Sequence, residues 1–150
     1  MSAVLSGGCE CGAIRYECAA EPVMAGHCHC RSCQKASGTG HASHIMVPKA
    51  ATTIAGEATF YERSADSGNT VRRGFCPNCG APVYGESSGW PDMLVLRAGS
   101  LDDPERFRPG MIVYAADAPS WDPMDPALPS SPKMPEADRQ TDFQERDSDG

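Results

Sequence analysis

The cysteines of this 150-residue chain are concentrated in a few closely spaced motifs. Seven of the eight cysteines fall in these motifs, which are Cys9 and Cys11 (C-x-C), Cys28, Cys30 and Cys33 (C-x-C-x2-C), and Cys76 and Cys79 (C-x2-C). A structural zinc ion takes four protein ligands, whereas a catalytic zinc keeps three and leaves a fourth position for water or substrate. Four thiols and three thiols therefore predict one closed zinc site and one open site, and we expect the function at the open one.

A disulfide framework is the competing interpretation of so many thiols. Cysteines one residue apart on an extended strand point to opposite faces, so a bridge between Cys9 and Cys11 or between Cys28 and Cys30 would be strained. The N-terminal sequence MSAVLSGG also lacks the basic start and apolar core of a secretory signal. We therefore expect metal binding in a reducing compartment, the cytoplasm.

Length and charge restrict the class of protein further. A chain of 150 residues fits a single domain. Much of the net charge of −7 comes from residues 122–150, so the remainder is nearly neutral and carries no basic stripe for nucleic acid. No apolar run approaches the ~20 residues of a membrane span. We expect residues 1–129 to form the zinc domain and residues 130–150 to form an acidic, proline-rich, disordered tail.

The local hydrophobic pattern is that of short strands separated by turns. In residues 13–18, Ile14, Tyr16 and Cys18 alternate with more polar positions, as in a half-buried strand. This pattern makes the eighth cysteine, Cys18, a buried hydrophobe rather than a ligand. A helix is indicated only around residues 32–37, so an all-β domain is predicted. Further strands are expected at residues 41–47, 58–63, 69–75, 82–86, 93–98 and 111–116.

The segment Phe75-Cys-Pro-Asn-Cys-Gly80 has the form of a zinc knuckle, in which two thiolates on a tight turn hold one metal ion. Gly80 permits the backbone conformation that points amide N–H groups at sulfur. The second pair of ligands is open at this point, because either Cys9 and Cys11 or Cys30 and Cys33 could complete the site. With Cys30 and Cys33, the result would be an ordinary zinc ribbon with no open position.

Taken together, the motifs resemble those of the glutathione-dependent formaldehyde-activating family (GFA, or CENP-V/GFA), over roughly residues 4–129. The resemblance implies an Mss4-like, zinc-binding β-sandwich with minimal helix. It also implies a carbon–sulfur lyase that forms or cleaves S-hydroxymethylglutathione from glutathione and formaldehyde. The segments that carry the resemblance are Gly8-Cys-Glu-Cys-Gly12 with Ile14-Arg-Tyr16, Cys28-His-Cys-Arg-Ser-Cys33-Gln, Phe75-Cys-Pro-Asn-Cys-Gly80, Ala98-Gly-Ser-Leu-Asp-Asp-Pro104 and Ser120-Trp121.

The resemblance also implies a division of the ligands between two Zn²⁺ ions per chain. Its structural zinc ligands match Cys9, Cys11, Cys76 and Cys79, and its catalytic zinc ligands match Cys28, Cys30 and Cys33. All seven cysteines are present.

Thiol activation by zinc is by itself a weak source of catalysis. A free thiol is only ~3% thiolate at pH 7, so coordination raises the reactive fraction at most ~30-fold. Much of this gain in rate is lost again, because the nucleophilicity of a thiolate falls as its pKa falls. Proximity and polarisation of the aldehyde oxygen must therefore supply most of the effect.

Proton transfer is needed as well, and the candidates for it are His27, His29, His41 and His44. Of these, His29 and His44 are predicted to act in catalysis. Arg31 and Lys35, close to the open site in the sequence, could offset its excess negative charge or bind a carboxylate of glutathione. For Lys35 a position on a solvated face is the favoured alternative.

Two other classes of function fit the same residues. A zinc-stabilised binding module would use the fold without chemistry. A thiol redox sensor would release zinc when Cys28, Cys30 and Cys33 are oxidised.

Overall fold

The computed structural model of the chain describes residues 3–135. It contains two compact units, each of which is built from two stretches of sequence. The first consists of the chain up to Pro22 together with Ile45–Phe107, and the second of Val23–His44 together with the chain from Arg108 onward. The described residues form mainly strands with a single α-helix, which confirms the all-β class expected from the sequence.

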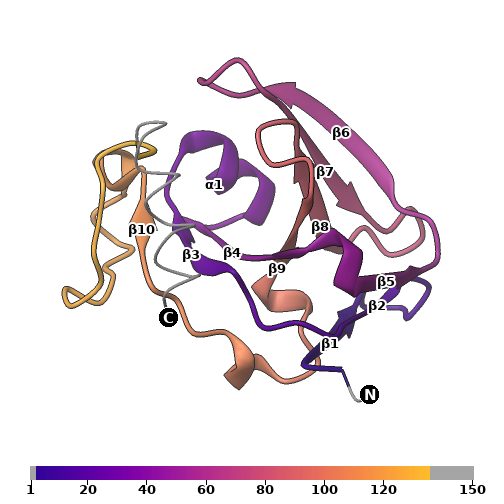
Figure 1. The fold of residues 1–150 in the computed structure, drawn as a ribbon. Helices are drawn as coiled ribbons and strands as arrows, with labels where there is room; N and C mark the ends of the chain where they lie inside the picture. The colour runs from indigo at the N-terminus through magenta and orange to yellow at the C-terminus, as the bar shows by residue number, and fades with distance from the viewer. Residues whose placement is uncertain (1–2, 136–150) are drawn as a thin grey trace. The chain divides into compact units, whose positions relative to one another are not determined.

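The first unit holds two sets of strands (Figure 1). One is a three-stranded antiparallel sheet in the order β1-β2-β5. The other runs in the order β4-β9-β8-β7-β6, and its β6–β7 and β7–β8 pairs are antiparallel. The strands are β1 (Leu5–Gly8), β2 (Arg15–Cys18), β4 (Ala42–Pro48), β5 (Thr52–Ala55), β6 (Thr59–Ser64), β7 (Thr70–Phe75), β8 (Pro82–Ser87) and β9 (Met93–Arg97).

The second unit contains the remaining strands and the helix. Strands β3 (Met24–Cys28) and β10 (Ile112–Val113) are parallel neighbours. The first residues of β4, up to His44, lie next to β3, so that the strand order is β10-β3-β4. The helix α1 (Arg31–Ser37) follows β3 after two residues (Figure 1). Single 3-10 turns complete the two units at η1 (Lys49–Ala51), η2 (Ala98–Ser100), η3 (Pro104–Arg106) and η4 (Ala115–Asp117).

Strand β2 shows why this sequence forms a sheet with one buried face. Tyr16 and Cys18 are buried while Arg15 and Glu17 are exposed, as the alternation in the sequence predicts. The Tyr16 hydroxyl lies 2.6 Å from Ser100 Oγ, and burial raises the pKa of Tyr16 to about 12. A side chain at Gly7 of β1 would come within 2.4 Å of that hydroxyl, so the glycine is what allows β1 to pack against the ring.

The last predicted strand, residues 111–116, is much shorter in the structure. Only Ile112–Val113 is extended, because Tyr114 adopts a left-handed conformation (φ 55°, ψ 38°) and η4 follows it. Strands β1, β3 and β5 were not anticipated, whereas the helix lies where it was expected.

The segment after η4, residues 118–132, is here called the strap. Its end returns to β10: Ile112 N donates to Pro129 O at 2.9 Å, and Ser131 N donates to Ile112 O at 2.9 Å. These two hydrogen bonds lie on either side of the expected boundary at 129/130, which stays a prediction. Most of the expected tail, from residue 136, lies outside the described residues. Within the described residues, no helix is long and apolar enough to cross a membrane.

Candidate metal centres

The first cysteine group lies in the first unit and joins the two paired motifs. The Sγ atoms of Cys9, Cys11, Cys76 and Cys79 all lie within 4.8 Å of one another. The Cys9–Cys11 and Cys11–Cys76 Sγ distances are both 3.7 Å. A tetrahedral zinc with Zn–S bonds of about 2.3 Å sets its sulfurs about 3.8 Å apart. A disulfide would need about 2.05 Å. The spacing therefore fits a four-thiolate metal site and excludes these disulfides.

Backbone amides point at the sulfurs of this group, as they do around thiolates. Ile14 N donates to Cys9 Sγ at 3.2 Å, and Asn78 N donates to Cys76 Sγ at 3.3 Å. The Ile14 amide is the main cause that lowers the pKa of Cys9 to about 6, against the opposing effect of burial. Gly80, which has a φ of +79°, closes the knuckle by donating from its N–H to Cys76 O at 2.8 Å. The knuckle is thus assembled with Cys9 and Cys11 and not with Cys30 and Cys33.

The second cysteine group lies in the second unit, where strand β3 gives way to helix α1. Cys28 is the last residue of β3, Cys30 is the N-cap of α1, and Cys33 lies in the first turn of the helix. Cys30 Sγ accepts a hydrogen bond from Cys33 N at 3.3 Å, so a thiol takes the capping role usually filled by an oxygen. Gly38 ends the helix in the left-handed conformation.

The three sulfurs of this group lie within 4.8 Å of one another. Cys28 and Cys33 are only 7% and 6% exposed. Hydrogen bonds with the neighbouring Cys30 and Cys33 thiols, together with burial, raise the pKa of the Cys28 thiol far above its usual range. A divalent cation held between the sulfurs would lower the pKa of Cys28 again, because it favours the thiolate. The donor set therefore fits zinc, with three thiols in place of four.

His44 lies at the edge of the second group. Its Nε2 is 3.6 Å from Cys33 Sγ. His44 does not belong to the group of ligand atoms that all lie within 4.8 Å of one another, which consists of the three thiols. The imidazole therefore lies beside the three-thiol group and is not a fourth member of it.

His29, between Cys28 and Cys30, is 1% exposed and holds the loop that carries these two cysteines. Its Nδ1 donates to Gly40 O at 2.8 Å, which fixes the proton on Nδ1 because a carbonyl only accepts. Its carbonyl accepts from Gln34 Nε2 at 2.7 Å, and Gln34 also reaches Asp117 O at 3.1 Å. These contacts fix the His29 ring and the backbone between the two cysteines.

Sequence reasoning missed Asp122, which the strap brings to the histidines. Asp122 Oδ2 accepts from His41 Nδ1 at 2.7 Å and lies 3.6 Å from His29 Nδ1. Gly40 makes room for it, since a Cβ there would lie 2.4 Å from Asp122 Oδ2. The remaining histidine, His27, lies 2.8 Å from Ser43 Oγ through Nδ1, and burial lowers its pKa. The position of Asp122 directly after Ser120-Trp121 was the only hint in the sequence.

The two basic residues proposed to bind a carboxylate lie on α1. Both Arg31 and Lys35 are exposed, and the Arg31 guanidinium donates to the side-chain oxygen of Gln34. Neither is paired with an acidic side chain among the ion pairs of the described residues.

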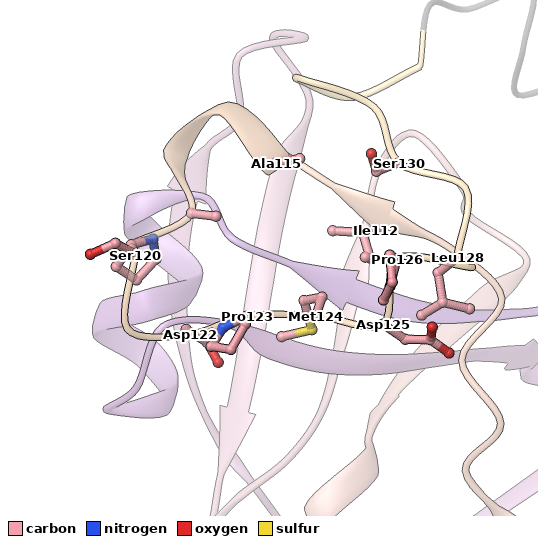
Figure 2. A pocket seen from close by; sticks show the side chains of 12 residues that line it. Ile112, Ala115, Ser120, Asp122, Pro123, Met124, Asp125, Pro126, Leu128 and Ser130 are labelled. Carbon is pink, nitrogen blue, oxygen red and sulfur yellow. The ribbon is translucent and has the colours of Figure 1, made fainter.

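A hollow of about 360 Å³ also lies in this unit, between β10 and the strap (Figure 2). Ile112 lines it, while the next residue, Val113, packs against the second cysteine group. The hollow and the cysteines are therefore on opposite faces of β10.

The close approach of Asp122 to Gly40 leads to a testable prediction. In protein loaded with zinc, Gly40→Ala should displace the Asp122 carboxylate and speed metal release from the second group by about 10- to 100-fold, as loss of outer-shell support usually does. The measurement is the rate of zinc transfer to a chromophoric chelator. Gly99→Ala is the matched control, because a Cβ at Gly99 meets nothing within 4 Å. Asp122→Asn should speed zinc release as Gly40→Ala does. Zinc release at the wild-type rate in both variants would show that the Asp122 carboxylate does not support the second group.

Comparison with known proteins adds to the geometry. Residues 4–117 match the family described as glutathione-dependent formaldehyde-activating enzyme. A crystal structure of a Rhodobacter sphaeroides protein from a structural genomics programme is similar, with 16% identity and a TM-score of 0.53. The similarity covers 84% of this chain and 99% of that chain, and at this identity it concerns the fold alone. No curated protein matches.

The matched range covers most of the chain and includes all seven cysteines of the two groups, together with His29 and His44. The two sheets with their single helix agree with the all-β, Mss4-like fold of that family. This chain therefore belongs to the glutathione-dependent formaldehyde-activating family.

Proposed function

We propose that this protein is a zinc-dependent carbon–sulfur lyase. It forms or cleaves the hemithioacetal between a thiol, such as glutathione, and formaldehyde or another small aldehyde. The observation that carries this proposal is the pair of unequal thiol groups within the family-matched range, one with four sulfurs and one with three. An incomplete metal site is the usual arrangement where a substrate must reach the ion.

In this proposal the two groups have different tasks. The group Cys9, Cys11, Cys76 and Cys79 holds a structural zinc, and the group Cys28, Cys30 and Cys33 holds the catalytic one. When bound at the second group, zinc supplies Lewis acidity, which favours the thiolate and polarises an aldehyde oxygen. The three cysteines fix where the substrate sulfur is bound, so that the thiol and the aldehyde meet as neighbours rather than as free solutes.

The reaction is balanced without any redox partner. A thiol R–SH and formaldehyde give R–S–CH₂–OH: the sulfur–carbon bond forms, the carbon–oxygen π bond breaks, and the thiol proton ends on oxygen. Cleavage is the reverse. One side chain can therefore take the proton from sulfur and return it to oxygen, which is the shuttle role that histidine performs well.

His44 suits this shuttle better than His29. Its Nε2 is 3.6 Å from Cys33 Sγ and its side chain is only partly buried, so a substrate at the three-thiol group is within its reach. His29 is 1% exposed and commits Nδ1 to a backbone carbonyl. We assign His44 to proton transfer and His29 to positioning of the ligand loop.

Lys35 and Arg31 provide the positive charge that a carboxylate of glutathione would need. They lie on α1, the same short helix that carries Cys33. In this reading, the thiol enters from the side of α1, in a reducing compartment such as the cytoplasm.

The test of the function is turnover by the zinc-loaded protein. With glutathione and ¹³C-formaldehyde, exchange spectroscopy by NMR should show interconversion of aldehyde and adduct that rises in proportion to protein concentration. Other small thiols and aldehydes should be compared in the same assay. If none is accelerated although two zincs are retained, the non-catalytic binding module replaces the enzyme. Reversible zinc loss on treatment with peroxide would instead support the redox sensor.

A further inference from the structure

Tyr114 has an unusual backbone conformation. Among the described residues it is the one non-glycine residue with a positive φ, at 55°. A bulky side chain rarely adopts this left-handed region. Such strain persists where the surrounding structure enforces it, and it is concentrated at ligand and active sites.

The left-handed turn changes which way the side chain of Tyr114 faces. Ile112 and Ala115 line the hollow beneath the strap (Figure 2), and Val113 packs on the other face against the second cysteine group. In a regular strand, Tyr114 would return to the face of the hollow. Instead it also packs against the cluster of Cys28, Cys33 and Ala42. Two consecutive side chains are thus directed to the cysteines.

Hydrogen bonds hold this arrangement on both sides of the tyrosine. Val113 pairs with Cys28 in the β10–β3 register, and its carbonyl accepts from His29 N at 3.1 Å. Tyr114 O accepts from Asp117 N at 3.0 Å, and Ala115 N donates to Ser131 O at 3.0 Å. Tyr114 is therefore tied to the ligand loop at one end and to the strap at the other.

We propose that Tyr114 is a specificity-determining residue whose ring forms a wall beside the substrate position of the second cysteine group and limits the size of the carbon group attached to the substrate sulfur. This inference rests on the proposed function. Tyr114 packs against the cluster of Cys28, Cys33 and Ala42, and a ligand sulfur that completes the three-thiol group must lie next to Cys28 and Cys33. The hydroxymethyl group from formaldehyde is the smallest such adduct, and each added methyl group would approach the ring.

Tyr114→Asn separates this role from a purely structural one. Asparagine tolerates the left-handed conformation better than most residues, so the variant should fold, keep both zincs and melt close to the wild type. The ratio of kcat/KM for formaldehyde to that for acetaldehyde, with the same thiol, should fall at least about tenfold, the usual discrimination of a pocket for one methylene. Tyr114→Phe keeps the ring and should leave the ratio unchanged.

Tyr114→Trp should change the ratio in the opposite direction, which keeps the test valid if Tyr114→Asn does not fold. An unchanged ratio in Tyr114→Asn or, should that variant not fold, in Tyr114→Trp would overturn the inference.

A binding experiment keeps this inference distinct from the proposed function if the wild type shows no turnover. Protein with cobalt in the second group should bind ethanethiol at least about tenfold more tightly than the branched 2-methyl-2-propanethiol, as read from the sulfur-to-cobalt absorption bands. Tyr114→Asn should lose this preference. Equal preference in the wild type and in Tyr114→Asn would overturn the wall independently of any activity.

Discussion

Cys11→Ser is expected to abolish the cooperative thermal transition of the protein, although Cys11 is exposed. Substitutions at exposed positions usually change the free energy of unfolding by no more than about 0.5 kcal/mol. Structural zinc sites contribute about 10–16 kcal/mol in small peptides, which equals or exceeds the ~5–15 kcal/mol net stability of a whole domain. If the four-thiol group holds zinc, removal of one ligand at the surface removes much of the stability of the first unit.

Cys18→Ser is the matched control for this prediction. Cys18 is fully buried, belongs to neither group, and has its Sγ 3.4 Å from Ala20 O. Its replacement should cost only about 1–3 kcal/mol, the penalty for a polar atom in the core. Judged by burial alone, Cys18→Ser would be the more destabilising of the two variants. Thermal denaturation followed by circular dichroism, with zinc content measured on the same samples, decides between them. A Cys11→Ser protein more stable than Cys18→Ser would show that the first group is not a structural metal site.

Cys33→Ser should have the opposite profile, with stability largely kept and activity lost. The second group is expected to hold the catalytic ion, and Cys33 is one of its three thiols. We expect the variant to fold, to retain one zinc of two, and to lose more than about 100-fold in kcat/KM, since even changes outside the ligand shell cost 10- to 100-fold.

The measurement for Cys33→Ser combines zinc content, melting temperature and the exchange assay. Cys18→Ser again controls for loss of a buried thiol. Cys33→Ser with near wild-type turnover would remove the second group from the chemistry. If it were as unstable as Cys11→Ser, the division into a structural and a catalytic group would be wrong.

Those parts of the fold that depend on local periodicity could be predicted from the sequence. In β2 the alternation of Tyr16 and Cys18 with charged residues is visible in the sequence, and the strand lies there. Strand β3 (MAGHC) has no such alternation, because four of its five residues are only partly buried. Strand β1 contains Gly7 and Gly8, and its glycines reflect close packing that only the tertiary structure reveals.

The site shows the same division between local and long-range information. Ligand spacing is local, so the two cysteine groups could be proposed from their motifs. The contact between Asp122 and His41 joins residues 81 positions apart, and the local pattern of neither segment predicts that the two side chains meet. The turn at Tyr114 was also hidden, because the sequence from Met111 to Ala116 favours a continuous strand and the hydrogen bonds to the strap and η4 interrupt it.

The four candidate histidines show where residue type alone is insufficient. All four have the chemistry for proton transfer, but their surroundings differ. His29 is enclosed and bonded to Gly40 O, and His41 is bonded to Asp122. His44 places its Nε2 3.6 Å from Cys33 Sγ of the second group. Solvent access and hydrogen-bond partners arise from tertiary packing, and they distinguish the roles proposed for these histidines.

The most direct test of the central claim, one closed and one open metal site, is the zinc X-ray absorption spectrum of the wild-type protein with and without substrate thiol. Zn–S distances near 2.3 Å are resolved from Zn–N or Zn–O distances near 2.0–2.1 Å. With two zincs per chain, groups of four and three thiols predict an average of about 3.5 sulfurs per zinc at rest, rising toward four when the thiol binds. An average of four at rest, unchanged by any thiol, would contradict the claim.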